Sequence, residues 1–321
     1  MAQQFLSNQI ITLKMQVFIY LRQTYYQKDQ VIDMILIVDD TYKFHEENMN
    51  TDNHSHYSFY TKRLPVGVTN AINNGGSCIY FNPLIPIKTF KNQYDPSAKD
   101  LRKIKYGVIS TENAVNDLIS WNAFAFAGRL QKPILTFINE QENQEVHLAN
   151  EKNRDMALNQ AIFMNFHQQK NVHLMDLYTD LCSLSYRGDI RMRFKMENPN
   201  KVKNVVLGSF DLLNEVYQPR LKNLVNDGIL EQVDSEMFKM KASTTNVQYL
   251  FDRIPDRLKT DMKKSVVQLS LRELQEDVQK NLESVVYKTS KEMILSGLYS
   301  TNPLKNLAYV YSKYQKGRGK K

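Results

Sequence analysis

The chain of 321 residues is poor in cysteine and in long apolar runs, and each shortage excludes a class of structure. Two cysteines, Cys78 and Cys182, are too few for a disulfide framework or a cysteine-rich zinc site. We expect them as ordinary buried thiols in a reducing compartment. No apolar run reaches the roughly 18 residues that a membrane-spanning helix needs. The sequence therefore predicts no transmembrane segment.

The composition supports a folded protein with a basic surface. Hydrophobic residues make up 42% of the chain, and its length is enough for two domains and a tail. The formal net charge is +8, which favours anionic partners such as phospholipids, nucleotides or nucleic acid. The alternative is a solvated basic surface without a specific partner.

An apolar segment at residues 31–39 contains an acidic residue, Asp33. Apolar side chains occupy both faces of the segment, which predicts a buried strand. A buried carboxylate costs several kcal/mol unless it is paired or binds a metal. Asp33 is therefore the best metal candidate, and a buried structural acid is the alternative. Asp39 and Asp40 follow at the expected strand end, where they would face a ligand or cap the next helix. Asp39 is too distant to share a metal with Asp33, because six strand residues span about 20 Å.

Turn signals and hydrophobic patterns predict an α/β fold in three parts. The first, residues 1–145, is a mixed α/β domain with helices at 5–20 and 113–126 and strands at 31–39, 78–81 and 133–138. Residues 105–109 are a further strand or a junction between a strand and a helix. The second, residues 146–255, has helices at 148–166, 172–184 and 201–224 and a short strand at 190–194, which suggests a winged-helix-like module. The third, residues 256–321, has a helical stretch at 262–296 and a basic tail.

The C-terminal segment has an amphipathic pattern. Apolar and aromatic residues recur at helical spacing, and lysines lie off that stripe: Leu304, Leu307, Ala308, Tyr311 and Tyr314 against Lys305, Lys313 and Lys316. A basic amphipathic helix with tyrosines suits an anionic membrane surface. The alternative is an ordinary packed terminal helix.

A series of short blocks along nearly the whole chain carries a family resemblance. In order they are HEENM (45–49), HYS (56–58), YFNP (80–83), IKYGVIS (104–110), DLISW (117–121), AGRLQKP (127–133), SYRGDIRM (185–192) and ENP (197–199). No single block is decisive, but the ordered set resembles the mitochondrial CDP-diacylglycerol synthase family, the phosphatidate cytidylyltransferases also called the translocator assembly and maintenance family.

The resemblance implies a nucleotidyltransferase-like domain that makes CDP-diacylglycerol and pyrophosphate from CTP and phosphatidate for cardiolipin synthesis. It implies Mg²⁺ as cofactor and a peripheral location on the matrix side of the mitochondrial inner membrane. The partners would be phosphatidate and a cardiolipin-rich membrane surface, not nucleic acid. The first 28 residues lack Asp and Glu, which weakly echoes an import signal. They also align with the family's catalytic domain, so we interpret them as retained structure.

The chain departs from the family at its phosphate-binding turn. Leu21-Arg22-Gln23 stands where the family has Gly-Ser-Gly, and a Cβ there crowds the approach of backbone to phosphate. The family's His in the 127–133 block is Gln131, and the Trp before its early His is Phe44. We therefore expect weak or absent activity. The alternative function is a non-catalytic accessory subunit of an inner-membrane, respiratory protein complex.

The expected site combines residues from several blocks. Asp33 would hold Mg²⁺, and Lys105 is either a phosphate ligand or a surface lysine. Asp189 and Arg191 either pair with each other or line the cleft. Nucleotide-site positions implied by the resemblance are Tyr20, Arg22, His56, Tyr57 and Ser58, with Asp39 and Asp40 as further catalytic candidates. A zinc site at His45, His54 and His56 is disfavoured because their spacing matches no common zinc pattern.

Overall fold

The computed structural model describes residues 15–20, 32–86, 103–137, 144–165, 171–241, 243–260 and 270–300. The chain forms two compact units. Unit 1 comprises Met1–Ala114, Ile134–Gln144 and Glu292–Lys313, and unit 2 comprises Val115–Pro133, Glu145–Lys291 and Tyr314–Lys321. The expected three-part division at residues 145 and 255 stays a prediction.

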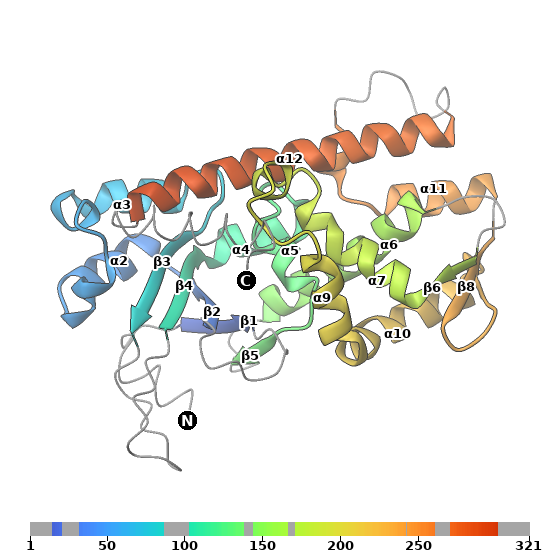
Figure 1. The fold of residues 1–321 in the computed structure, drawn as a ribbon, viewed down its shortest axis with the longest axis horizontal. Helices are drawn as coiled ribbons and strands as arrows, with labels where there is room; N and C mark the ends of the chain where they lie inside the picture. Colours follow the sequence, from blue (N-terminus) through green and yellow to red (C-terminus); the bar gives the residue numbers. More distant parts are fainter. Residues whose placement is uncertain are drawn as a thin grey trace, which may run out of the picture. The chain divides into compact units, whose positions relative to one another are not determined.

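Unit 1 is built on a five-stranded mixed sheet with the order β3-β4-β2-β1-β5 (Figure 1). Strand β2 runs parallel to β4, and the other neighbours are antiparallel. The strands are β1 (Met15–Tyr20), β2 (Ile32–Val38), β3 (Tyr80–Pro86), β4 (Lys103–Ser110) and β5 (Leu135–Phe137). The central position of β2 agrees with its sequence, because all side chains from Met34 to Val38 are buried.

Two helices follow the sheet's central strand and pack against each other, α2 (Thr41–Met49) and α3 (Val66–Asn73). Asp40 begins α2, since its carboxylate accepts a hydrogen bond from the Lys43 backbone N–H at 3.0 Å. Two short 3₁₀ turns lie between the helices, η1 (Asp52–His56) and η2 (Thr61–Arg63). They place the 52–63 segment beside β3.

Unit 2 is mainly helical and has a small antiparallel sheet with the order β6-β8-β7. Its strands are β6 (Asn171–His173), β7 (Leu230–Gln232) and β8 (Met237–Met240). The helices of units 1 and 2 beyond α3 are α4 (Thr111–Ser120), α5 (Ala127–Leu130), α6 (Gln144–Met164), α7 (Leu174–Ser183), α8 (Ile190–Arg193), α9 (Lys201–Gly208), α10 (Phe210–Asn226), α11 (Thr244–Asp252) and α12 (Leu271–Ser300), with 3₁₀ turns η3 (Leu184–Tyr186) and η4 (Asp256–Leu258). Buried aromatic and leucine side chains of α7 and α10 form much of the core, among them Tyr178, Leu181 and Tyr217.

Three local predictions were wrong. Residues 15–20, expected as the end of a helix, form β1, because they pair with β2 on one side and β5 on the other. Residues 190–193 form the short helix α8 instead of a strand, since Asp189 caps it. The single helix expected at 201–224 is divided at Ser209 into α9 and α10. The beginning of the first expected helix, residues 5–14, lies outside the described residues.

Within the described ranges, no helix is long and apolar enough to cross a membrane. The expected amphipathic helix at 303–316 lies outside the described residues.

Candidate functional site

One row of the unit 1 sheet gathers three of the predicted site residues. The strand register places Asp33 of β2 opposite Tyr20 of β1 and beside Lys105 of β4. Paired residues on neighbouring strands share one face of a sheet, so Asp33 and Lys105 project to the same side. The Lys105 ammonium lies 4.2 Å from the centre of the Phe81 ring. Arg22 lies outside the described residues, two positions after Tyr20 in the sequence.

Asp33 is exposed, which excludes the buried structural acid that the sequence had left open. It stands second in β2, before the five buried residues that make the strand's interior. Its carboxylate is therefore available to a ligand without the cost of burial. In the described parts of the chain, no three Asp, Glu, His or Cys side chains gather to hold a metal. A lone carboxylate suits Mg²⁺ that is shared with substrate phosphates, which is how this ion is commonly bound.

The other two acidic candidates lie at the opposite end of β2. The Asp39 carboxylate accepts a hydrogen bond from the Thr111 hydroxyl at 3.1 Å. The Asp40 carboxylate caps α2, which is the structural role that the sequence offered as an alternative. The intervening strand separates both from Asp33 by about 20 Å. The structure therefore does not bring the three acids together.

His45 belongs to a buried polar network in unit 1. Its Nδ1 lies 2.9 Å from the Tyr57 hydroxyl, and its Nε2 lies 2.9 Å from Oδ1 of Asn73. The second contact requires a proton on Nε2, so Nδ1 accepts from Tyr57. Burial lowers the pKa of His45 to about 4, against a hydrogen bond to Asn73 that raises it. The imidazole is neutral and fully engaged, which leaves no nitrogen for a metal.

The predicted nucleotide-site residues at 56–58 are mostly buried. Tyr57 and Ser58 are buried, and the Ser58 hydroxyl donates to the Tyr299 carbonyl at 2.8 Å. His56 is half-buried, with Nδ1 3.0 Å from the Tyr106 hydroxyl. Burial, followed by the nearby Lys62 charge, lowers the pKa of His56 to about 4. Of the three residues, His56 alone has substantial exposure. His54 is exposed and does not join the network of His45.

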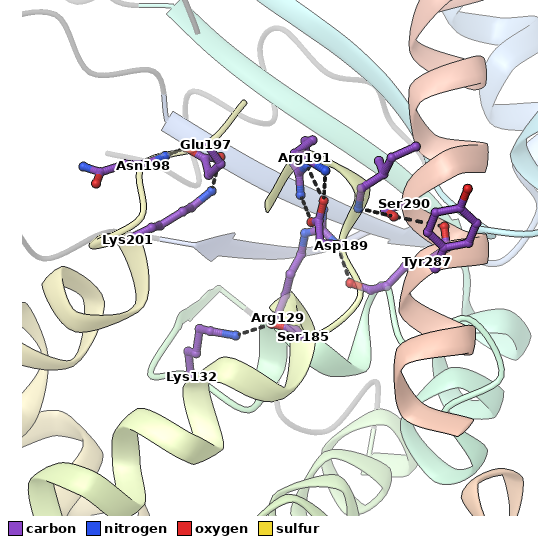
Figure 2. A network of polar contacts seen from close by, with 12 residues as sticks. Arg129, Lys132, Ser185, Asp189, Arg191, Glu197, Asn198, Lys201, Tyr287 and Ser290 are labelled. Carbon is purple, nitrogen blue, oxygen red and sulfur yellow. Dashed lines mark hydrogen bonds and ion pairs between the residues drawn. The ribbon is translucent and has the colours of Figure 1, made fainter. Parts of the chain in front are cut away.

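The second group of predicted site residues lies in unit 2, where Asp189 and Arg191 hold each other (Figure 2). The Arg191 guanidinium donates from Nε at 3.1 Å and from Nη2 at 2.6 Å to the two carboxylate oxygens. Burial opposes the charge on Arg191, but the Asp189 carboxylate outweighs it and raises the pKa of the guanidinium. Asp189 also accepts from the Arg191 backbone N–H at 2.8 Å and so caps α8.

Figure 2 places further cations near this pair that sequence reasoning missed as site residues. Arg129 extends from α5 toward Asp189, Lys132 follows α5 and reaches Ser185, and Lys201 of α9 reaches Glu197. Arg129 and Lys132 stand in the block at 127–133, which carries the family resemblance and could have indicated them as site residues. These side chains come from segments far apart in the sequence, and the folding of the chain brings them together.

Two other residues of the sequence blocks are structural. The Asp117 carboxylate is buried and accepts four backbone N–H groups, from Ala123, Phe124, Phe126 and Ala127. Burial raises the pKa of Asp117, and the four donors act in the opposite direction. Trp121 is buried, stacks on Phe124 with ring centres 4.2 Å apart, and donates to Asn153 at 2.9 Å. Gln131, at the position of the family's His, is buried 3.4 Å from the same Asn153 oxygen.

The fold and these groups define a mixed α/β protein with an exposed acid at the open end of a central strand and a separate cluster of cations. Comparison with known proteins identifies its relatives. A family model described as "Phosphatidate cytidylyltransferase, mitochondrial" matches residues 16–316. The chain therefore belongs to the mitochondrial phosphatidate cytidylyltransferase family.

Curated relatives with the same name match this chain over most of their length. The mouse (Mus musculus) protein is 29% identical over 308 residues, which cover 91% of this chain and 85% of the relative. The Schizosaccharomyces pombe protein is 28% identical, with 91% and 76% covered. The Drosophila melanogaster protein is 29% identical, with 89% and 85% covered. All three are named mitochondrial phosphatidate cytidylyltransferase.

Proposed function

We propose that this protein binds CTP and phosphatidate as a mitochondrial phosphatidate cytidylyltransferase whose turnover is weakened by its phosphate-binding turn. The family membership supports the substrates. The observation that carries the site is the pairing of Tyr20 with Asp33, because the Leu21-Arg22-Gln23 segment follows Tyr20 directly.

In the proposed reaction, an oxygen of the lipid phosphate attacks the α-phosphorus of CTP. The bond between that phosphorus and the bridging oxygen breaks, and pyrophosphate leaves with the electron pair. Asp33 would hold Mg²⁺ together with the nucleotide phosphates, and the ion would supply neutralisation of their charge. Lys105 lies in the same row on the same face and would add a positive charge. Arg22 would act as a further cationic phosphate ligand.

The impaired turnover rests on residues 21 and 23. Glycines in such a turn allow backbone N–H groups to approach phosphate oxygens and allow positive φ angles. Leu21 and Gln23 carry Cβ atoms that hinder both. Each lost N–H donor to a reacting phosphate weakens catalysis by about 3 kcal/mol, by analogy with oxyanion holes. CTP binding should therefore be weak and product formation slow.

A non-catalytic role is the second candidate, and the same two residues favour it. In that case the protein would serve as an accessory subunit of an inner-membrane complex, on the matrix side. The proposed architecture is common to both candidates. It comprises a nucleotidyltransferase-like unit 1, supported by the mixed sheet with an acid in its central strand, and a winged-helix-like arrangement in unit 2, supported by the β7–β8 hairpin that pairs with β6 beside α7.

The test compares CTP binding with Mg²⁺ and formation of CDP-diacylglycerol in the unmodified protein, two variants and one control variant. We expect slow product formation that Asp33→Ala abolishes, and faster formation in the triple variant Leu21→Gly, Arg22→Ser, Gln23→Gly. Asp52→Ala, which removes an exposed acid from η1, is the matched control. If neither the unmodified nor the triple variant binds CTP, the accessory role is favoured, and a complex with larger membrane proteins should be recoverable in mild detergent. Rapid turnover by the unmodified protein would contradict the impairment.

A further inference from the structure

A buried lysine in unit 2 forms no ion pair within the described part of the chain. Lys132 is 3% exposed, and its ammonium donates to the Gly128 carbonyl at 2.6 Å and to the Ser185 hydroxyl at 2.9 Å. Among the residues that the structure describes, no carboxylate forms an ion pair with it. Burial of an unpaired charge is costly, so a lysine in this position needs another reason.

The ring of Tyr186 lies at the centre of a group of cations around Lys132. The Lys132 ammonium is 5.3 Å from the ring centre, and the Lys201 ammonium is 5.2 Å from it. The two ammonium groups are therefore no more than about 10.5 Å apart, the sum of these distances. Arg191 is close enough to Tyr186 for the two to interact electrostatically, and Arg129 is close enough to Lys132 to do so. We call Arg129, Lys132, Arg191 and Lys201 the basic cluster.

The acids at the basic cluster are already bound. Asp189 pairs with Arg191, and Glu197 pairs with Lys201. Lys132 forms no ion pair with a carboxylate in the described part of the chain, so its positive charge at the cluster is not balanced by a pairing acid. The side chain of Arg191 is 41% exposed, against 14% for Lys201. A ligand can therefore reach the cluster through the Arg191 side chain.

The backbone around the basic cluster is held in place from α12. The Ile190 N–H donates to the Ser290 hydroxyl at 3.1 Å, and that hydroxyl donates to the Tyr287 carbonyl at 3.0 Å (Figure 2). The Lys132 ammonium is likewise fixed by two acceptors. Positions held in this way make a preorganised site, because the cations do not have to be ordered when the ligand binds.

We propose that the basic cluster binds a phosphate group of a substrate, with Arg191 and Lys201 in contact with it and Lys132 supplying charge. Guanidinium and ammonium groups together are the usual protein ligands of phosphate. The inference rests on the proposed function, in which both substrates carry phosphates. A lipid phosphate and the nucleotide triphosphate share this chemistry, and the experiment below distinguishes them.

The main test uses Lys132→Met, which removes the charge and keeps the length of the side chain. Binding of two probes, dihexanoyl-phosphatidate and CTP, is measured by calorimetry at fixed salt. We expect Kd to rise at least tenfold for the probe whose phosphate occupies the cluster, while the melting temperature stays equal or rises. A rise for the lipid probe alone assigns the site to the lipid phosphate, and a rise for CTP alone assigns it to the nucleotide. Arg272→Met, which removes an exposed cation of α12, should change neither Kd.

A structural role for Lys132 gives the opposite pattern. The variant would then melt at a lower temperature and bind both probes as the unmodified protein does, which overturns the proposal. Equal weakening by Lys132→Met and Arg272→Met, or no binding of either probe by the unmodified protein below about 1 mM, which corresponds to about −4 kcal/mol, would also overturn it.

A second measurement needs no variant. Burial lowers the pKa of Lys132 to about 8, against a smaller influence of Cys182, and the Arg129 charge lowers it further. The groups facing it are Arg129 of α5, Cys182 of α7, Tyr186 of η3 and, across the Tyr186 ring, Lys201 of α9. A bound phosphate raises the pKa of Lys132, so binding at pH 8 should take up protons, seen as different heats in two buffers. Absence of proton uptake contradicts the proposal.

Turnover separates this proposal from the proposed function. A protein that forms no CDP-diacylglycerol but loses phosphate binding in Lys132→Met would keep the site and reject the function. A protein that is active and unchanged by Lys132→Met would keep the function and reject the site.

Discussion

Two glycines of unit 2 provide a matched pair for testing how α12 holds the basic cluster. Gly188 and Gly228 both have positive φ, +85° and +74°. A Cβ added at Gly188 would lie 2.4 Å from the Glu283 carbonyl oxygen in α12, whereas at Gly228 nothing lies within 4 Å. Alanine at either position should cost about 1–2 kcal/mol of unfolding free energy for the left-handed backbone alone.

The extra cost at Gly188 follows from what must move. A backbone oxygen at 2.4 Å cannot stay there, so the turn at residues 188–190 has to shift away from α12. The shift breaks the hydrogen bond from Ile190 to Ser290, worth about 1 kcal/mol net, and loosens the packing around it. We expect Gly188→Ala to cost about 3 kcal/mol or more and Gly228→Ala about 1 kcal/mol.

Urea denaturation with equal m-values measures both losses. Phosphate binding should weaken in Gly188→Ala, because Asp189 and Arg191 follow the shifted turn, and should be unchanged in Gly228→Ala. If the two variants lose the same stability, the contact between Gly188 and α12 does not contribute, and the reasoning is refuted.

Three further predictions concern other parts of the chain. The free energy of unfolding should fall as pH drops from 6.5 to 4, because the unfolded chain binds a proton at His45, whereas the pKa of His45 in the folded protein is about 4. His45→Gln should remove up to about 3 kcal/mol of this pH dependence. Equal pH profiles of the two proteins would contradict the prediction. Asp117→Asn should lower the free energy of unfolding, measured in urea, by about 3 kcal/mol, since an amide NH₂ then faces the backbone N–H donors. Asp256→Asn, at an exposed carboxylate, should lower it little. Similar losses of stability in the two variants would show that the four hydrogen bonds of Asp117 are weak. Deletion of residues 303–321 should reduce flotation with cardiolipin-containing liposomes, and unchanged flotation would exclude this segment as the anchor.

The sequence predicted most elements whose hydrophobic pattern is compatible with only one type of secondary structure. Strand β2 is apolar on both faces, and the helical periodicity of residues 148–166 agrees with α6. The segment at 15–20 has β-branched and aromatic residues in a pattern that fits a helix or a strand. Its state is decided by β2 and β5, which lie 12 and more than 100 residues further along the chain. Local patterns carry no information about such partners.

The roles of the candidate site residues stay predictions, and only part of their placement in the fold had a signal in the sequence. Asp33 was recognised because an acid in an apolar run is unusual, but its exposure depends on where β2 begins. The burial of His45 and Tyr57 had no local signal, since both stand in polar stretches and their network closes through Asn73 of α3. The basic cluster joins α5 and the residues just after it, α8 and α9, and no spacing in the sequence connects these segments.

Trp121 gives the molecule an optical property of practical use. It is the sole tryptophan of the chain, it is buried, and it lies in unit 2. Its emission therefore reports on one unit, and loss of the Phe124 stack and the Asn153 bond on unfolding should shift that emission to longer wavelength. Buried tyrosines lie in both units, Tyr57, Tyr80 and Tyr106 in unit 1 and Tyr178 and Tyr217 in unit 2, so near-ultraviolet circular dichroism reports on both units. The two signals together allow separate melting of the units to be recognised in the unlabelled protein.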